Sequence, residues 1–170
     1  IGTNIGNTGC SITGLPGYMT ESISLSNISL TFDGGGTKEM SGREIPELDE
    51  AYPEHDMFGI LPAYGFYCRH CKNIRFSNMQ LSFAGTEMRP AILCDDVEIM
   101  VINSLMAGTA DGIDPVITRN STVFLDGNRL LSSSGKSSGM YVNCNIRYTD
   151  DREIRINTPG AVKSKRMEII

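Results

Sequence analysis

Six side chains between positions 52 and 89 have the chemistry to bind an anionic or sugar-like ligand. They are Tyr52, Glu54, His55, Arg69, His70 and Arg89. An arginine grips a carboxylate with two parallel charge-assisted hydrogen bonds, and a tyrosine offers an apolar face to a sugar ring. We therefore take these six residues as candidate substrate-binding residues.

The two arginines also have a structural interpretation. Arg69 and Arg89 stand beside apolar segments, next to an irregular stretch that contains the candidates at 52, 54 and 55. Pairing of either guanidinium with a carboxylate would pin that stretch to the rest of the fold. The carboxylates in question are Glu54, Asp56 and Asp96. Pinning is the favoured interpretation, and direct ligand contact is the alternative.

Cysteine chemistry has little support. Cys68 and Cys71 form a CxxC pattern, which occurs in zinc sites and redox pairs, but one such pattern without a second pair of ligands is a weak signal. If residues 65–71 run into a strand, the two thiols point to different faces, and a buried thiol behaves mainly as a small apolar side chain. A disulfide remains an alternative, although the five cysteines are an odd number and define no framework. We expect no metal and no cofactor.

An internal repeat predicts the elements that position these side chains. Segment 22–32 recurs in outline as segment 73–83. Each copy has apolar residues at matching places and an asparagine, Asn27 or Asn78, at the fifth place from its isoleucine. A strand, a corner and a second strand therefore repeat together, which is typical of a solenoid.

Further repeat units are predicted at 91–103, 116–128, 140–147 and 153–157. Aligning Ile74, Val97 and Thr122 gives steps of roughly 23 to 25 residues, within the period range of parallel solenoids. We predict an all-β fold in which one domain, 1–170, forms part of a right-handed parallel β-helix. The alternative is an antiparallel β-sandwich, whose strands recur every 8 to 12 residues or so but which gives no reason for the matched asparagines.

Stacked coils would bury one continuous core and place short amides at the corners. The predicted core residues are Ile23, Leu25, Ile28, Leu30, Ile74, Phe76, Met79, Leu81, Val97 and Ile99. The predicted corner residues are Asn27, Asn78 and Asn103, because asparagine tolerates left-handed backbone and forms hydrogen-bonded ladders. The stretch 37–64 interrupts the repeat and contains three prolines and an acidic run. This composition predicts a long loop inserted between coils.

Composition limits the partners. The net charge of -5 disfavours nucleic acid, because a phosphate backbone attracts clustered Lys and Arg. No run of about 18 or more apolar residues occurs, so we expect no membrane span. The chain begins at Ile1 without a methionine or a targeting signal, so we expect a processed chain or a fragment. An open β-helix end exposes unpaired backbone, so we expect a cap or a second copy in a homo-oligomer to cover it.

Several short segments of the sequence are similar to segments of a known family. They lie at 10–17, 28–36, 52–54, 57–59, 61–67, 69–70, 89–91 and 95–97. In this order they resemble the C-terminal half of bacterial glycoside hydrolase family 28 proteins, the polygalacturonase-like β-helices. The resemblance covers roughly residues 9–130.

The resemblance implies a secreted or periplasmic protein that hydrolyses pectin-type polysaccharide, either polygalacturonan or rhamnogalacturonan, so its partner would be a uronate-containing glycan. Inverting hydrolysis needs one carboxylic acid to protonate the glycosidic oxygen and one carboxylate to activate water. The family's catalytic motifs, Asn-Thr-Asp, Asp-Asp, Gly-His-Gly and Arg-Ile-Lys, are not present intact and in order. We therefore expect the catalytic coils to precede Ile1 and assign no catalytic residue. The alternative is a non-catalytic β-helix that binds glycan or serves as a structural or assembly module.

Two near matches to these motifs have a structural alternative. The segment from Thr109 to Asp114 is similar to the family's Asn-Thr-Asp-Gly-Ile-Asp but lacks its Asn and Thr, and Asp95-Asp96 is similar to the paired aspartates in reversed order. We favour the interpretation in which Asp95 and Asp96 cap a turn before a strand at Val97 by accepting backbone N–H bonds.

Overall fold

The computed structural model describes residues 2–3, 6–126, 128–132, 137–141, 144–148 and 154–157, with side chains at 2 and 6–125. In this part of the chain the fold is all-β, with twelve strands and one four-residue helix. The first elements are β1 (Gly2–Thr3), β2 (Cys10–Thr13), β3 (Thr20–Glu21), β4 (Ser24–Phe32) and α1 (Lys38–Ser41). The central strands are β5 (Phe66–Phe83), β6 (Ile92–Thr109), β7 (Val116–Arg119) and β8 (Thr122–Asp126). The last strands are β9 (Asn128–Ser132), β10 (Ser137–Tyr141), β11 (Cys144–Tyr148) and β12 (Ile154–Asn157).

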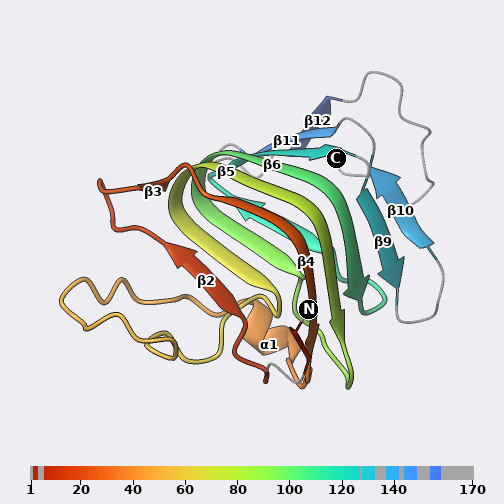
Figure 1. Ribbon diagram of the computed structural model, residues 1–170, viewed down its shortest axis with the longest axis horizontal. Helices are drawn as coiled ribbons and strands as arrows, with labels where there is room; N and C mark the ends of the chain where they lie inside the picture. The colour runs from red at the N-terminus through yellow and green to blue at the C-terminus, as the bar shows by residue number, and fades with distance from the viewer. Residues whose placement is uncertain are drawn as a thin grey trace.

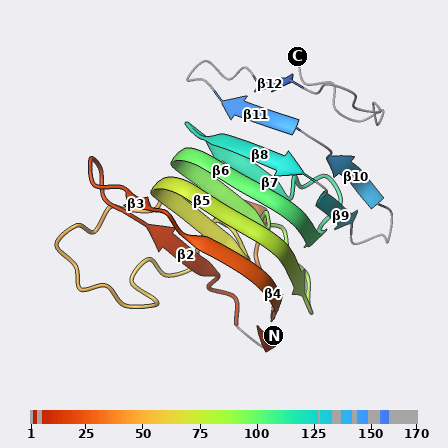
Figure 2. The same cartoon turned by 45° about the horizontal axis from the view of Figure 1, so that its top comes forward.

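Four strands lie side by side as parallel neighbours in the order β4, β5, β6, β8 (Figures 1 and 2). One rung of the ladder joins Leu25, Phe76, Ile102 and Leu125. The two copies of the sequence repeat are therefore spatial neighbours in register. The all-β prediction is confirmed, and the parallel pairing of these strands is not the pairing of an antiparallel sandwich.

The predicted alignment of the third repeat unit is wrong by three residues. Ile74 pairs with Met100, and Val97 pairs with Cys71 instead. The step from β5 to β6 is 26 residues, as in the His70–Asp96 contact, which is longer than predicted. The step from β6 to the next strand is 24 residues at the Val97–Ser121 contact, which lies within the predicted range.

Left-handed corners interrupt the long strands at regular places. Ten non-glycine residues of the described chain have positive φ. Nine of them form three columns across neighbouring strands: His70–Asp96–Asn120, Ser22–Asn73–Ile99 and Asn27–Asn78–Ser104. Asn78 Nδ2 donates to Asn27 Oδ1 over 2.7 Å, so the corners predicted at Asn27 and Asn78 and their ladder are confirmed. Asn103 is wrong by one position, because Ser104 has the left-handed backbone.

The asparagine ladder gives a first testable prediction. Replacing Asn78 with alanine is expected to lower the free energy of unfolding by about 1–2 kcal/mol, because alanine at φ 52° meets steric strain and loses the amide hydrogen bond. Asn78→Gly, which relieves the strain and loses only the hydrogen bond, is the matched control and should cost less. Urea unfolding curves measure both. An alanine variant as stable as the native protein would show that the ladder is not needed.

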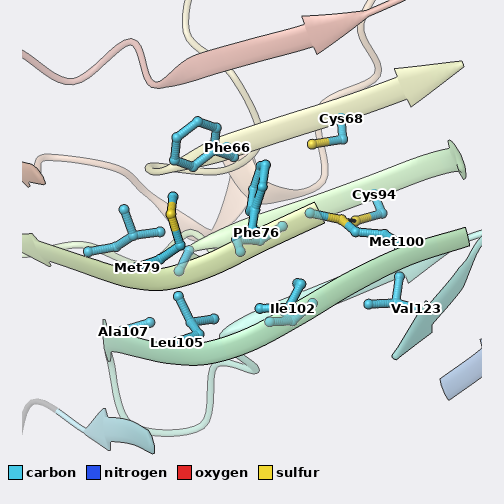
Figure 3. Packing of buried hydrophobic residues seen from close by; sticks show 14 of the residues in the cluster. Phe66, Cys68, Phe76, Met79, Cys94, Met100, Ile102, Leu105, Ala107 and Val123 are labelled. Atoms are coloured by element: carbon cyan, nitrogen blue, oxygen red, sulfur yellow. Dashed lines mark hydrogen bonds between the residues drawn. The ribbon is translucent and has the colours of Figure 1, made fainter. Parts of the chain in front are cut away.

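A continuous apolar core lies on one side of these strands (Figure 3). Side chains alternate along each strand, so every second residue between corners points inward. Of the predicted core, Ile74, Phe76, Met79, Leu81 and Val97 are buried, and four residues of β4 and its approach are partly buried against them: Ile23, Leu25, Ile28 and Leu30. Ile99 is wrong, because its side chain is 46% exposed at a left-handed corner.

Residues 33–65 leave the parallel strands and form an ordered excursion that contains α1 but no strand (gold to orange in Figure 1). A second apolar cluster holds this excursion against the outward face of the sheet. Tyr67 and Leu93, which are paired neighbours on β5 and β6, are covered by Ile45, Phe58 and Leu61. The predicted loop at 37–64 thus falls within a segment that docks on the outside of the strands.

The last units of the predicted repeat do not continue the parallel ladder. β11 pairs with β8 and β12 in antiparallel fashion, and β10 pairs antiparallel with β9. The parallel units predicted at 140–147 and 153–157 are therefore wrong in strand direction where the structure describes them. No helix among the described residues has the length and apolar character to cross a membrane.

Candidate functional site

Charged side chains gather on the outward face of the parallel strands. Arg69 of β5, Asp95 of β6 and Arg119 of β7 occupy one rung, while the inward neighbours Cys68 and Cys94 face the core. The next position along each strand is a left-handed corner and carries His70, Asp96 or Asn120. We call the set Glu47, Arg69, His70, Asp95, Asp96 and Arg119 the charged face.

His70 lies between two carboxylates. Its Nδ1 is 2.7 Å from Asp96 Oδ2, and its Nε2 is 3.2 Å from Glu47 Oε2. Ionised carboxylates only accept hydrogen bonds, so both contacts are hydrogen bonds when both ring nitrogens carry a proton. The His70 side chain therefore joins the excursion, through Glu47, to two neighbouring strands.

Arg69 is a pin for the excursion. It donates to Ile45 O at 2.6 Å and Pro46 O at 3.0 Å, and Nη1 is 3.3 Å from Glu47 Oε1. Its guanidinium also lies over the rings of Phe58 and Tyr67, at 5.6 and 5.7 Å from their centroids. The pinning interpretation is confirmed for Arg69, but through Glu47 and backbone carbonyls rather than through the predicted carboxylates.

Arg89 is an internal clamp, set apart from the charged face. Its Nε and Nη2 donate to the two oxygens of Glu87 at 2.8 and 2.7 Å, and both side chains are fully buried. Nη1 donates to Asn7 O and Leu61 O. The clamp thereby fixes the end of the excursion and the N-terminal segment, so pinning is confirmed here too, with Glu87 as a partner that was not predicted.

The remaining sequence candidates lie on the exposed part of the excursion. Tyr52 is 80% exposed, and Glu54 and His55 are exposed as well. In the described chain, none of the three makes a side-chain hydrogen bond or ion pair with Arg69, His70 or Arg89. The structure therefore brings two of the six candidates together, Arg69 and His70, and leaves the other four apart from them.

Sequence reasoning missed Glu47 and Arg119 as members of the site. Glu47 lies in the acidic run at 47–50, which carried no positional signal, and Arg119 follows a short apolar strand without a recognisable motif. Asp95 and Asp96 were singled out, but their predicted capping role is wrong. The Val97 N–H donates to Ser121 Oγ over 2.9 Å, and Asp96 contacts His70 instead.

Asp95 is a carboxyl group of the charged face whose pKa is shifted. Burial raises its pKa, while the nearby charges of Arg119, Arg69 and His70 partly oppose the rise and Asp96 adds to it. A carboxyl with a raised pKa retains its proton closer to neutral pH, which is the property of a general acid. The charged face thus presents one half-buried carboxyl with a raised pKa, two carboxylates in contact with His70, and two guanidinium groups.

The raised pKa of Asp95 makes stability depend on pH. Native Asp95 binds its proton more tightly than the unfolded chain, whose carboxyl has a pKa near 3.8, so its contribution to stability falls as pH rises through the native pKa. The variant Asp95→Asn removes this dependence. The measured quantity is the melting temperature of the variant minus that of the native protein. We expect this difference to be larger at about pH 7 than at about pH 3. Equal differences at both pH values, in calorimetric scans, would contradict the raised pKa.

The CxxC residues are core residues. Cys68 and Cys71 are both buried and free, and both belong to the same apolar cluster, so the prediction that they point to different faces is wrong. The left-handed corner at His70 lies between them and resets the alternation. Burial raises the pKa of the Cys71 thiol to about 12, which leaves it protonated and unreactive. Among the described residues, no group of three or more His, Cys, Asp or Glu side chains is arranged to hold a metal ion.

The near match at 109–114 is a turn. Thr109 Oγ1 donates to Ile113 O at 2.7 Å, and the Ile113 N–H donates to Ala110 O. The buried threonine hydroxyl thus closes the turn that follows β6. Its hydrogen bonds give this segment a structural role.

Comparison with known proteins found no matching family model, no matching curated protein and no matching solved structure. The relevant geometry is a charged face at the base of an ordered excursion whose outer part is exposed.

Proposed function

We propose that this chain belongs to a right-handed parallel β-helix protein that hydrolyses pectin-type polysaccharide, with the parallel strands β4, β5, β6 and β8 forming part of its C-terminal coils. The parallel ladder through β4, β5, β6 and β8 supports the coil architecture. The three columns of left-handed residues support it as well, because a flat sheet needs no repeated corners. The core on the inward side of the same strands is the third support.

The observation that carries the proposed function is the charged face. It combines Asp95 and Asp96 with Arg119 on the outward side of adjacent strands, beside a docked excursion that presents Tyr52. Guanidinium groups recognise the carboxylates of uronate residues, and carboxyl groups bind sugar hydroxyls. In this proposal the charged face and the excursion bind and orient the glycan, and the catalytic residues stay unassigned because the family's motifs are not intact in this sequence.

A polymeric polysaccharide is encountered outside the cytoplasm, so a secreted or periplasmic location is part of the proposal. A partner at the end of the stack is also part of it. Among the described strands, β2 and β3 pair only with β5. The apolar side chains of Ile12 in β2 and of Ile23 just after β3 are only partly buried. A further coil, a cap or a second copy of the chain would pair with this edge.

The alternative function is a non-catalytic β-helix that binds glycan or assembles with other chains. It is favoured by the internal engagement of Arg69 and Arg89, which serve the excursion and the interior. In both functions the charged face binds glycan. They differ in whether the protein also hydrolyses glycosidic bonds.

Reducing-sugar release from a panel of polygalacturonan and rhamnogalacturonan oligosaccharides tests the proposal. The 170-residue chain and any longer product of the same gene are assayed side by side. We expect the longer product to release reducing ends and the 170-residue chain to bind without release. Binding without release by both proteins supports the alternative, and neither binding nor release by either protein overturns the proposal.

A further inference from the structure

A hollow of about 250 Å³ opens on the outward side of β5 and β6, next along the strands from the charged face. Two rungs line it. The first consists of the left-handed residues Ser22, Asn73 and Ile99, and the second of Ser24, Arg75 and Val101. Neighbouring strands lie about 4.8 Å apart, so the hollow crosses three strands and extends roughly 10 Å along the stack.

Ile99 is the residue that needs an explanation. A β-branched residue with φ near 60° is a strained outlier, and the matching positions in the neighbouring strands are Ser22 and Asn73, which are short and polar. The isoleucine side chain is also 46% exposed to solvent rather than buried in the core. Residues held in sparsely populated backbone conformations cluster at ligand clamps and other functional sites, so the strain at Ile99, in the lining of a hollow, points to a ligand contact.

The other lining groups define the chemistry of that ligand. Arg75 is exposed and, within the described chain, has no carboxylate partner, whereas the neighbouring Lys72 is paired with Glu98 at 3.0 Å. The hydroxyls of Ser22 and Ser24 and the amide of Asn73 can both donate and accept hydrogen bonds. The hollow therefore offers one cation, several hydroxyl-matching groups and one apolar patch.

We propose that this hollow is a subsite for a short acidic saccharide, with Arg75 on its carboxylate, the serine and asparagine side chains on its hydroxyls, and Ile99 against an apolar face of the sugar ring. This inference rests on the proposed function, because it names where a uronate unit sits beyond the charged face. It adds a recognition site that none of the six sequence candidates occupies.

The test is calorimetric titration with trigalacturonate and with its methyl ester, a neutral molecule with the same backbone. For the native chain we expect tighter binding of the acid. For Arg75→Gln we expect the affinity for the acid to fall at least about tenfold, which is about 1.4 kcal/mol, with little change for the ester. Lys38→Gln on α1 removes an exposed positive charge elsewhere and is the matched control, which should bind both ligands as the native chain does.

Ile99→Asn separates a ligand role from a folding role. Asparagine suits the left-handed backbone, so the variant should melt at or above the native temperature while binding trigalacturonate more weakly. Native-like binding by both Arg75→Gln and Ile99→Asn would overturn the subsite and leave the proposed function standing. Failure of the native chain to bind trigalacturonate at all would overturn both.

Discussion

Replacing Arg89 with methionine is expected to lower the free energy of unfolding by about 3–5 kcal/mol, the cost of leaving one member of a buried ion pair without its partner. Glu87 has no exposed side-chain surface, so its carboxylate cannot recover solvation in the folded protein. The change also removes the donors to Asn7 O and Leu61 O. Because small domains are stable by only about 5–15 kcal/mol, this single change removes a large part of the total.

Two further variants isolate the ion pair. Glu87→Gln keeps hydrogen-bonding groups beside Arg89 and should cost less than Arg89→Met. The double variant with methionine at both positions removes both charges, so its loss should be smaller than the sum of the single losses. Denaturant unfolding measures all of them. Additive losses, or an Arg89→Met protein with native stability, would contradict the clamp.

Gly36 belongs to the same clamp. Its N–H donates to Glu87 Oε2 over 3.3 Å, and a Cβ at this position would overlap Glu87 Oε1 and Arg89 Nε. The backbone of the excursion can therefore approach the ion pair only without a side chain. This close approach holds the excursion beside the ion pair just after it leaves β4.

Replacing Arg69 with methionine is expected to release the excursion from the outward face of the strands. The guanidinium supplies the hydrogen bonds to Ile45 O and Pro46 O and the ion pair with Glu47, and losing them costs roughly 2–4 kcal/mol of docking free energy. The released carbonyls can turn to water, so the strands should stay folded while the excursion opens. Local opening of this kind appears as faster amide exchange.

Hydrogen exchange and limited proteolysis measure the release. Cleavage within the exposed part of the excursion, around Tyr52, should accelerate at least about tenfold in Arg69→Met. Glu47→Gln, which keeps the carbonyl hydrogen bonds of Arg69, is the matched control and should change much less. Native protection of the excursion in Arg69→Met would mean that the apolar contacts of Phe58 and Leu61 suffice without the pin.

The sequence predicted the parallel repeat because its signal is local. Asn27 and Asn78 mark left-handed corners, and this pattern is visible in each segment alone, without knowledge of the strand that pairs with it. Register was harder to predict, because an isoleucine at position 99 looks like a core residue by type. The structure places it at a corner, and this shifts the alignment of β6 by three residues.

The candidate site could be predicted only in part. Arg69 and His70 were found because arginine and histidine beside a loop are informative in themselves. Their partners Glu47 and Asp96 are 23 and 26 residues from His70 in sequence. The docking of the excursion brings Glu47 to the site, and the pairing of β5 with β6 brings Asp96. The burial of Arg89 with Glu87 could not be predicted either, because sequence pattern alone does not show that a charged pair is enclosed by the excursion and the N-terminal segment.

Recognition of an acidic glycan is the central claim, and the most direct test is the affinity of the native chain for oligogalacturonate at low and at physiological salt. We predict measurable binding that weakens as salt rises, because guanidinium–carboxylate attraction at a partly exposed face is screened. The fully methyl-esterified oligosaccharide of the same length should bind more weakly and with little salt dependence. Equal affinity for the acidic and esterified forms, or no binding of either, would contradict the claim.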